Sequence, residues 1–149
     1  DGDFLQLQMY NGRSQYTIKQ YNPAQKKFVV SENPLQDLKE KIIQGDKGDG
    51  IPNILTQDNV FMEGGRQRPI TEAKIINWLN QKPEEFCNEE MLRNYKRNEL
   101  LIDLTRVPET LQTAIIDTYE NTSAKTKQVF MNYMIANKLK NLLEVIDEF

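Results

Sequence analysis

The chain has 149 residues, of which 38% are hydrophobic and 28% are charged, a composition typical of one soluble globular domain with a modest core. It contains neither a run of about 18 apolar residues, which a membrane span needs, nor a cleavable leader, so we expect a cytoplasmic protein. One cysteine, no histidine and a net charge of −3 exclude an intramolecular disulfide and a cysteine- or histidine-based zinc site, and leave carboxylates to carry any chemistry.

Short-range patterns predict a β-hairpin followed by a helix in the first third of the chain. Residues 16–30 have β-rich character on both sides of a turn at residues 22–25. Ser31 or Asn33 can cap the helix that follows, and a proline in the first turn also indicates a helix start. The helix should end near Gly45, the first glycine after the apolar repeat.

Glycine and proline interrupt every periodic pattern between Gly45 and Pro69, which predicts an ordered loop or turn. Loops of this length are usually functional or disordered. Pro69 should start a helix, and after Pro83 the periodicity predicts helices only, the last of them running from residue 139 to 149. The expected apolar stripes are Ile75, Trp78 and Leu79; Met91, Leu92 and Tyr95; Leu111, Ala114, Ile115 and Tyr119; Val129, Phe130, Tyr133 and Met134; and Leu139, Leu142, Leu143 and Ile146.

The net negative charge weakens affinity for nucleic acid unless charges of one sign gather on one face. Basic residues do cluster, which leaves open a basic face on an acidic protein or a set of solvated helix faces. The clusters are Lys39, Lys41 and Lys47; Arg66, Arg68 and Lys74; Arg93, Lys96 and Arg97; and Lys125 and Lys127.

Two pairs of aspartates are candidate metal ligands. Asp1 and Asp3 are one residue apart, a spacing that directs both carboxylates to the same side of an extended chain. Asp46 and Asp49 stand between glycines that allow a tight turn. Clustered carboxylates repel one another unless a divalent cation neutralises them, but aspartate and glycine are also common turn formers, so a turn without metal remains an alternative. The spacing does not fit a calcium-binding loop.

The two acidic segments together resemble those of the 5'-nuclease family in the flap endonuclease superfamily. DGDFLQL at residues 1–7 is similar to the family's D-x-D-x-x-Q-L, and GDKGDGIP at residues 45–52 is similar to G-D-x-x-D-N-I-P. The similarity to the phage ribonucleases H of the T-even type extends over the whole chain. It includes the charged turn at residues 25–27, the stretch 101–103 and the ending at residues 146–149.

The resemblance implies a mainly α fold: the C-terminal helical domain of a 5'-nuclease, with a small β-hairpin and a helix-turn-helix-like duplex-binding segment. Within residues 1–149, it places the end of the nuclease core at 1–44, the acidic loop and duplex-binding segment at 45–80, and a helical bundle at 81–149. The first residue is not Met, so we expect a longer protein whose missing N-terminal lobe holds further acidic residues. The piece alone should then be inactive.

The resemblance also implies a site that uses Mg²⁺ or Mn²⁺ to remove RNA primers or 5' flaps from duplex DNA during replication in a phage-infected cell. Asp1, Asp3 and Asp49 would be catalytic ligands, and Asp46 a nearby acidic partner at the same metal site. Lys47, Arg66, Arg68 and Lys74 would contact phosphates of the duplex or RNA–DNA hybrid. The glycine-rich continuation that accompanies a monovalent cation in the family is absent here.

Several features leave alternatives open. A noncatalytic helical module that binds duplex or a protein partner would explain the same acidic turns. A third possibility, a structural calcium-binding domain, would require stable calcium affinity without an effect on DNA. The terminal helix could dock a sliding clamp or a single-strand-binding protein, or pack on the bundle. Trp78, Phe130 and Tyr133 are expected in the core rather than in base stacking, and Cys87, which has no histidine partner, is expected to be inert.

Overall fold

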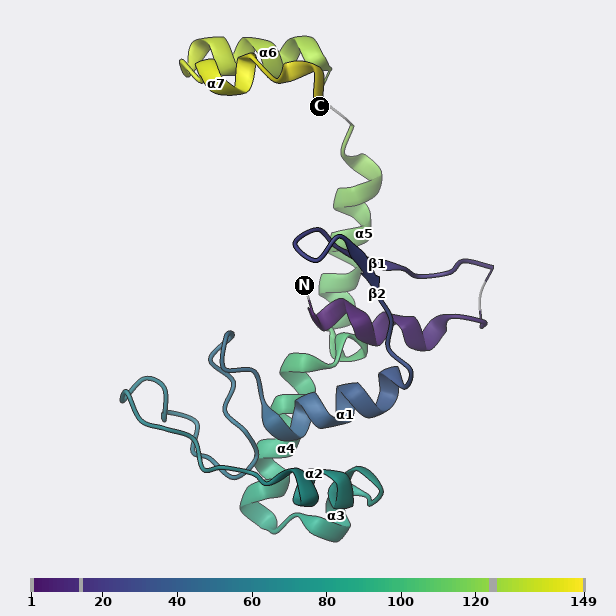
Figure 1. Ribbon diagram of the computed structural model, residues 1–149, viewed down its shortest axis with the longest axis vertical. Coiled ribbons are helices and arrows are strands. Elements are labelled where there is room, and N and C mark those ends of the chain that lie inside the picture. The colour runs from purple at the N-terminus through teal and green to yellow at the C-terminus, as the bar shows by residue number, and fades with distance from the viewer. Residues whose placement is uncertain (1, 14, 124–125, 149) are drawn as a thin grey trace. The chain divides into compact units, whose positions relative to one another are not determined.

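The computed structural model describes residues 2–13, 15–123 and 126–148. The chain divides into two compact units, Asp1–Val107 and Pro108–Phe149, which we describe separately (Figure 1). The first unit holds η1 (Gly2–Tyr10), β1 (Gln20–Asn22), β2 (Lys27–Val29), α1 (Pro34–Gln44), α2 (Glu72–Leu79), α3 (Pro83–Phe86), α4 (Glu89–Ile102) and η2 (Leu104–Arg106); the second holds α5 (Glu109–Asn121), α6 (Lys127–Ala136), α7 (Lys140–Leu143) and η3 (Ile146–Glu148).

The fold is mainly helical with one small antiparallel hairpin in the described residues, which confirms the predicted fold class. The division between the units falls inside residues 81–149, the segment expected to form one bundle. The three functional segments stay a prediction. Among the described residues, no helix combines the length and the apolar character needed to cross a membrane.

The hairpin pairs β1 with β2 so that Tyr21 lies opposite Phe28. Its first strand begins four residues later than the sequence pattern indicated. The reason is visible at Ile18, whose N–H and carbonyl both bond to the side-chain amide of Asn11, at 2.7 and 3.1 Å. Because these backbone groups are already engaged, they are not used in a strand ladder.

The segment that carries Asp3 is the 3-10 helix η1 and not an extended chain, so that expectation was wrong. Two buried glutamine side chains, Gln6 and Gln8, hold η1 in place. Each amide makes a reciprocal pair of bonds with backbone, as a strand peptide would. Gln6 donates to the carbonyl of Ile102 at 3.0 Å and accepts from the N–H of Leu104 at 2.9 Å; Gln8 donates to Val29 and accepts from Ser31, both at 2.9 Å.

Helix α1 begins and ends where its sequence predicts. The side chain of Asn33 accepts from the N–H of Gln36 at 3.2 Å, and Pro34 occupies the first turn. At the other end Gly45 has a φ of +71°, a conformation that side chains disfavour. A Cβ at Gly45 would also overlap the backbone of Ile51 and Pro52. Only glycine therefore fits where the chain leaves α1.

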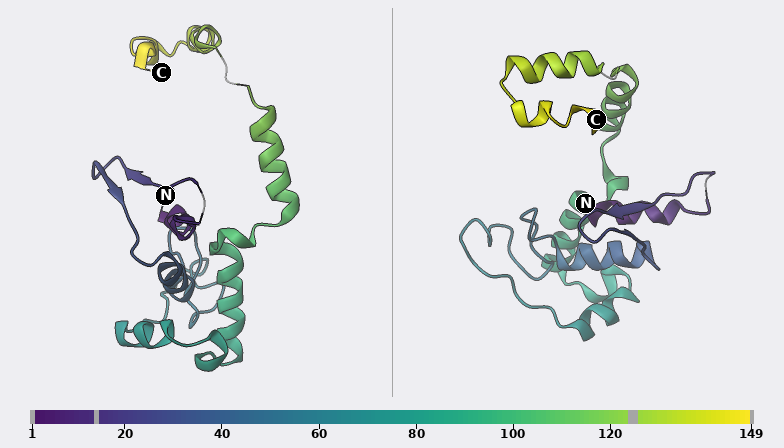
Figure 2. Two further views of the ribbon diagram at one scale, coloured as in Figure 1. Left: turned by 90° about the vertical axis from the view of Figure 1, so that its right-hand side faces the viewer. Right: turned by 45° about the horizontal axis from the view of Figure 1, so that its top comes forward.

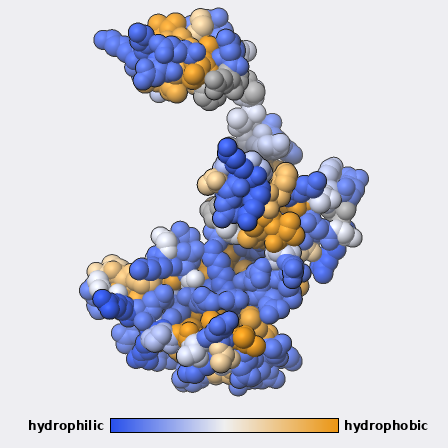
Figure 3. All heavy atoms as spheres, viewed as in Figure 1, coloured by the Kyte–Doolittle hydropathy of each residue, from blue (hydrophilic) through white to orange (hydrophobic). Residues whose placement is uncertain are grey.

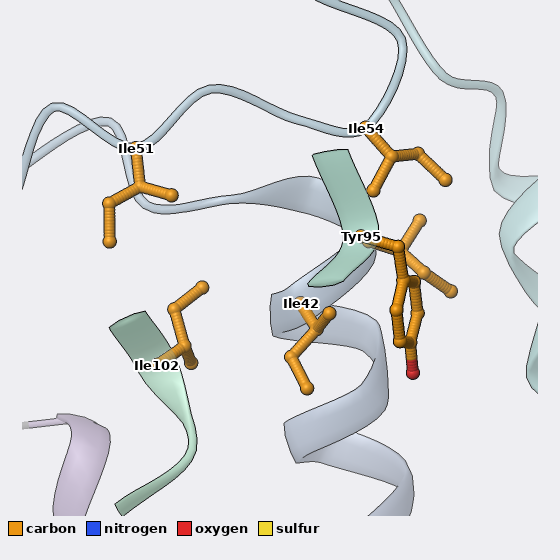
Figure 4. Close-up of a cluster of buried hydrophobic side chains, with 6 residues drawn as sticks. Ile42, Ile51, Ile54, Tyr95 and Ile102 are labelled. Atoms are coloured by element: carbon orange, nitrogen blue, oxygen red, sulfur yellow. The ribbon is translucent and has the colours of Figure 1, made fainter. Parts of the chain in front are cut away.

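The core of the first unit forms where α1, the following loop and α4 meet. Its buried members are Ile42, Ile43, Ile51, Ile54, Tyr95 and Ile102, five of which are labelled in Figure 4. η1 and α1 lie side by side in this unit, and α1 also contacts α2 and α4 (Figure 2). The core thus sits under the loop that carries the second pair of aspartates.

Helix α2 begins at Glu72, three residues later than the proline pattern suggested. The backbone before it is held in the loop, because Arg68 donates its N–H to the hydroxyl of Thr56 at 3.0 Å and its carbonyl accepts from Asn53 at 2.7 Å. Residues 45–69 contain no helix and form an ordered loop with many internal bonds, as predicted.

The second unit contains the predicted helices α5 and α6, but not the predicted continuous C-terminal helix. Helix α7 ends at Leu143, and up to residue 148, where the described part of the chain ends, only the short η3 follows. The break precedes two adjacent β-branched residues, Val145 and Ile146, which are poor helix formers. Met134 is buried in this unit. Other apolar residues remain exposed there, and Figure 3 shows hydrophobic residues gathered on the surface of α6 and α7.

Candidate metal centre

Three of the four predicted acidic ligands come together in the first unit. Asp3 lies in the first turn of η1, and Asp46 and Asp49 lie in the loop that follows α1. One carboxylate oxygen from each is within 4.8 Å of those of the other two. Residues more than 40 positions apart thus form one acidic cluster. The fourth predicted ligand, Asp1, lies outside the described residues.

The geometry of the loop follows from its local sequence. Asp46 and Ile51 exchange two backbone hydrogen bonds, of 2.9 and 2.7 Å, which close the base of the turn. At its tip, Oδ1 of Asp46 accepts from the N–H groups of Gly48 at 2.9 Å and Asp49 at 3.3 Å. The turn therefore brings Asp49 back toward Asp46, while the other oxygen of Asp46 faces a lysine.

That lysine is Lys41, from the last turn of α1. Its ammonium contacts Oδ1 of Asp3 and lies 2.8 Å from Oδ2 of Asp46. Burial lowers the pKa of Lys41, but its contacts with Asp3 and Asp46 outweigh burial and raise the pKa above the ordinary value. The hydrogen bond from Lys41 lowers the pKa of Asp46, against an opposing effect of burial. Both groups are therefore charged at neutral pH.

Helix α4 holds both ends of the acidic turn through a fully buried side chain, Asn98. Its amide nitrogen donates to the carbonyl of Ile42 at 2.8 Å and to that of Pro52 at 2.9 Å. Arg97 donates from Nε and Nη2 to the oxygen of Asn98, which fixes the orientation of the amide, and also to Pro52. Asp58 contacts Arg97 in turn. A chain of polar contacts thus sets the spacing of the turn's two ends.

The donor set fits a hard divalent cation. Magnesium takes oxygen ligands, usually one or two carboxylates completed by water and substrate phosphates. The side chains of Asp3 and Asp46 are each 24% exposed and Asp49 is exposed, so water and phosphate have access. A cleft of about 410 Å³ opens beside the cluster, lined by Asp3 and Lys41 among others.

The four predicted phosphate contacts are all exposed. Lys47 lies in the acidic turn, Arg66 and Arg68 lie in the loop before α2, and Lys74 lies on α2. Their exposure is compatible with phosphate binding, and their assignment as a duplex contact stays a prediction.

The aromatic and thiol predictions have mixed outcomes. Trp78 stacks on Phe86 with ring centroids 5.1 Å apart and packs against the core, as expected. Tyr133 was expected in the core but is 60% exposed, so that prediction was wrong. Burial, with a smaller effect of Glu84, raises the pKa of the Cys87 thiol to about 11, which agrees with an inert cysteine.

Sequence reasoning missed two residues that shape the centre. Lys41 was noted only as part of a basic cluster, and its position five residues before Asp46 was not connected with the acidic pair. The sequence does contain a pattern that could have identified Asn98. Asn94 and Asn98 are four residues apart, on the helical face that carries Tyr95 and Ile102. Polar amides on a buried helical face are usually hydrogen-bonded to backbone.

Comparison with known proteins places this chain in a family. A family model described as "T4 RNase H, C terminal" matches residues 32–149, which include Asp46 and Asp49. The chain is also 26% identical over 156 residues to a protein named Ribonuclease H from Enterobacteria phage T4, in an alignment that covers all of this chain and 50% of that protein. The chain thus spans half the length of this relative. It belongs to the family of T4 RNase H C-terminal domains.

Proposed function

We propose that the chain carries part of the active site of a 5'-nuclease that uses Mg²⁺ or Mn²⁺ to remove RNA primers or 5' flaps from duplex DNA. The observation that carries the proposal is the cluster of Asp3, Asp46 and Asp49, whose oxygens lie within 4.8 Å of one another. Family membership and a relative named Ribonuclease H support nucleic acid as the substrate class.

Each residue has a distinct part in the proposed site. Asp3 and Asp49 bind the cation, and Asp46 both orders the turn through the N–H groups of Gly48 and Asp49 and adds negative charge. The bound metal would activate water and stabilise the leaving oxygen in phosphodiester cleavage. Lys47, Arg66, Arg68 and Lys74 hold phosphates of the duplex, which positions the strand.

A second function is favoured by one observation. Lys41 already bonds to Asp3 and Asp46, so the cluster is partly neutralised without a metal. This supports a noncatalytic helical module that binds duplex or a protein partner, in which the acidic turn only shapes the loop. The two functions differ in whether Asp49 contributes to metal affinity.

The test measures Mn²⁺ or Mg²⁺ binding by calorimetry and cleavage of a 5'-labelled flapped duplex. The proteins are the 149-residue chain and its covalent fusion to the N-terminal half of the relative. We expect no cleavage by the chain alone and metal-dependent cleavage by the fusion. Asp49→Asn keeps the size of the side chain but removes an anionic ligand, so metal affinity and cleavage should fall together while duplex binding survives.

Asp117→Asn is the matched control, because Asp117 is an exposed aspartate on α5. It should leave both measurements unchanged. Full cleavage by the Asp49→Asn fusion at saturating metal would contradict the assignment of Asp49 and leave the noncatalytic module. Strong cleavage by the 149-residue chain alone would show that other residues of this chain complete the site.

A further inference from the structure

A second feature of the first unit is the charge of its N-terminal region. Residues 4–31 contain no aspartate or glutamate, although the whole chain has a net charge of −3. The same stretch contains four basic residues, Arg13, Lys19, Lys26 and Lys27, all of them exposed. The hairpin therefore lies in a locally cationic part of an acidic protein, which favours contact with a polyanion.

The hairpin presents an aromatic pair on its outer face. Tyr21 and Phe28 are cross-strand partners, and their rings meet edge to face with centroids 5.4 Å apart. They are 53% and 59% exposed, in spite of their size. Single exposed apolar residues are ordinary. Here two exposed rings contact each other, and lysines lie on the same hairpin.

The hairpin is attached to η1 along an edge of β2. Side chains alternate between the two faces of a strand, so Gln20 and Val29 lie on the side away from the aromatic pair. Both are partly buried, and the carbonyl of Val29 accepts from Gln8 on η1 at 2.9 Å. The hairpin is thus held at an edge of β2, its Gln20–Val29 side is partly buried, and its aromatic face is exposed.

We propose that this face binds a single-stranded segment of nucleic acid. An unpaired base stacks on the Tyr21–Phe28 pair, and Lys26 in the turn contacts a flanking phosphate. A single strand fits better than a duplex, because its bases have free faces for stacking on aromatic side chains. The proposal rests on the proposed function only for nucleic acid as the substrate class.

The location is compatible with a strand that reaches the acidic cluster. Gln8, which binds the hairpin, is five residues from Asp3 on the same 3-10 helix. With a rise of about 2.0 Å per residue, the two positions are separated by about 10 Å along the helix axis. The hairpin is therefore attached to the same helix that carries Asp3.

The experiment measures binding of fluorescent oligodeoxythymidylate, and of an abasic strand of the same length, in EDTA so that the metal site does not contribute. The aromatic variant is Tyr21→Leu with Phe28→Leu, and the matched control is Tyr119→Leu with Tyr133→Leu, two exposed tyrosines of the second unit. We expect the aromatic variant to bind oligodeoxythymidylate at least about tenfold more weakly, with binding of the abasic strand and of the control unchanged.

A charge variant tests the phosphate contact. Lys26→Gln should weaken binding of both strands and reduce the log-log salt slope by about 0.7, the value for one phosphate on a single strand. Tyr21→Trp provides a measurement that does not depend on loss of function. Its added emission should be quenched by oligodeoxythymidylate, while the emission of the control proteins should not change.

The proposal is overturned if the aromatic variant binds oligodeoxythymidylate as tightly as the unchanged chain, or if it loses affinity equally for the abasic strand. Unquenched emission of Tyr21→Trp overturns it as well, even if the double variant fails to fold. None of these results bears on the metal affinity of Asp49, so a failure here is distinct from a failure of the proposed nuclease site.

Discussion

Replacing Asn98 with leucine tests how the acidic turn is held. Leucine has a similar volume but no polar atoms, so it cannot form the two hydrogen bonds to Ile42 and Pro52. The guanidinium of Arg97 also loses the acceptor of its Nε and one acceptor of its Nη2 in a partly buried place. Each buried polar group left without a partner costs about 1–3 kcal/mol, and Pro52 keeps its bond from Arg97. We therefore expect a decrease of about 2–4 kcal/mol in the free energy of unfolding of the first unit.

The assay is urea denaturation followed by tryptophan emission. The chain has one tryptophan, Trp78, which packs against the core of the first unit, so the signal reports this unit alone. Asn94→Leu is the matched control, because Asn94 is equally buried and donates to the carbonyls of Ile54 and Thr56, beyond the acidic turn. Both variants should lose stability to a similar extent.

The two variants should differ in metal affinity, measured by calorimetry under conditions where both are folded. Asn98→Leu releases the two ends of the turn that carries Asp46 and Asp49, so its affinity should fall, whereas that of Asn94→Leu should not. A destabilisation below about 1 kcal/mol in Asn98→Leu would refute the energetic reasoning. Equal metal affinity in the two variants would refute the positioning role.

Two further predictions concern charge. Replacing Arg66 and Arg68 with alanine should reduce the log-log salt slope of duplex binding by about 0.9 for each phosphate that the arginines neutralise, without a change in base preference; an unchanged slope removes both residues from the interface. The pKa of Asp46 is lowered in the folded state. The Asp46 carboxylate therefore contributes to the free energy of unfolding above the ordinary carboxyl pKa of about 4, and this contribution is lost as pH falls through the lower pKa of the folded state. Asp46→Asn should therefore flatten the acid side of the stability profile measured by Trp78 emission, and a profile as steep as that of the unchanged chain would contradict the role of Lys41.

Local signals predicted most of the first unit correctly. Asn33, Pro34 and Gly45 fix the two ends of α1 through backbone rules that act over a few residues, and the hairpin turn is equally local. The starts of β1 and α2 were placed less well, because backbone groups before them, at Ile18 and Arg68, bond to the side chains of Asn11 and Thr56, seven and twelve residues earlier. Such partners lie beyond the few residues over which capping and turn rules act.

The candidate site shows the same limit. The two acidic segments were found from their residues, and their approach in space was inferred from a family resemblance, not from spacing. The contact of Lys41 with both of them depends on the packing of η1 against α1, which no periodicity reveals. In the second unit, apolar stripes predicted α5 and α6 correctly, but they did not predict that Leu111, Ile115 and Tyr119 would remain exposed. An amphipathic pattern indicates a helix, but it does not specify which other element packs against the apolar face of that helix.

The paired amide contacts of Gln6 and Gln8 have a consequence for Asp3. The two glutamines bind backbone at two separate places, the end of α4 and the exit of the hairpin. A rotation of η1 about its own axis would break all four hydrogen bonds together. The four bonds therefore fix the rotational orientation of the helix about that axis. The direction in which Asp3 points around that axis is therefore determined by segments about 25 and 100 residues further along the chain, and not by its neighbours in sequence.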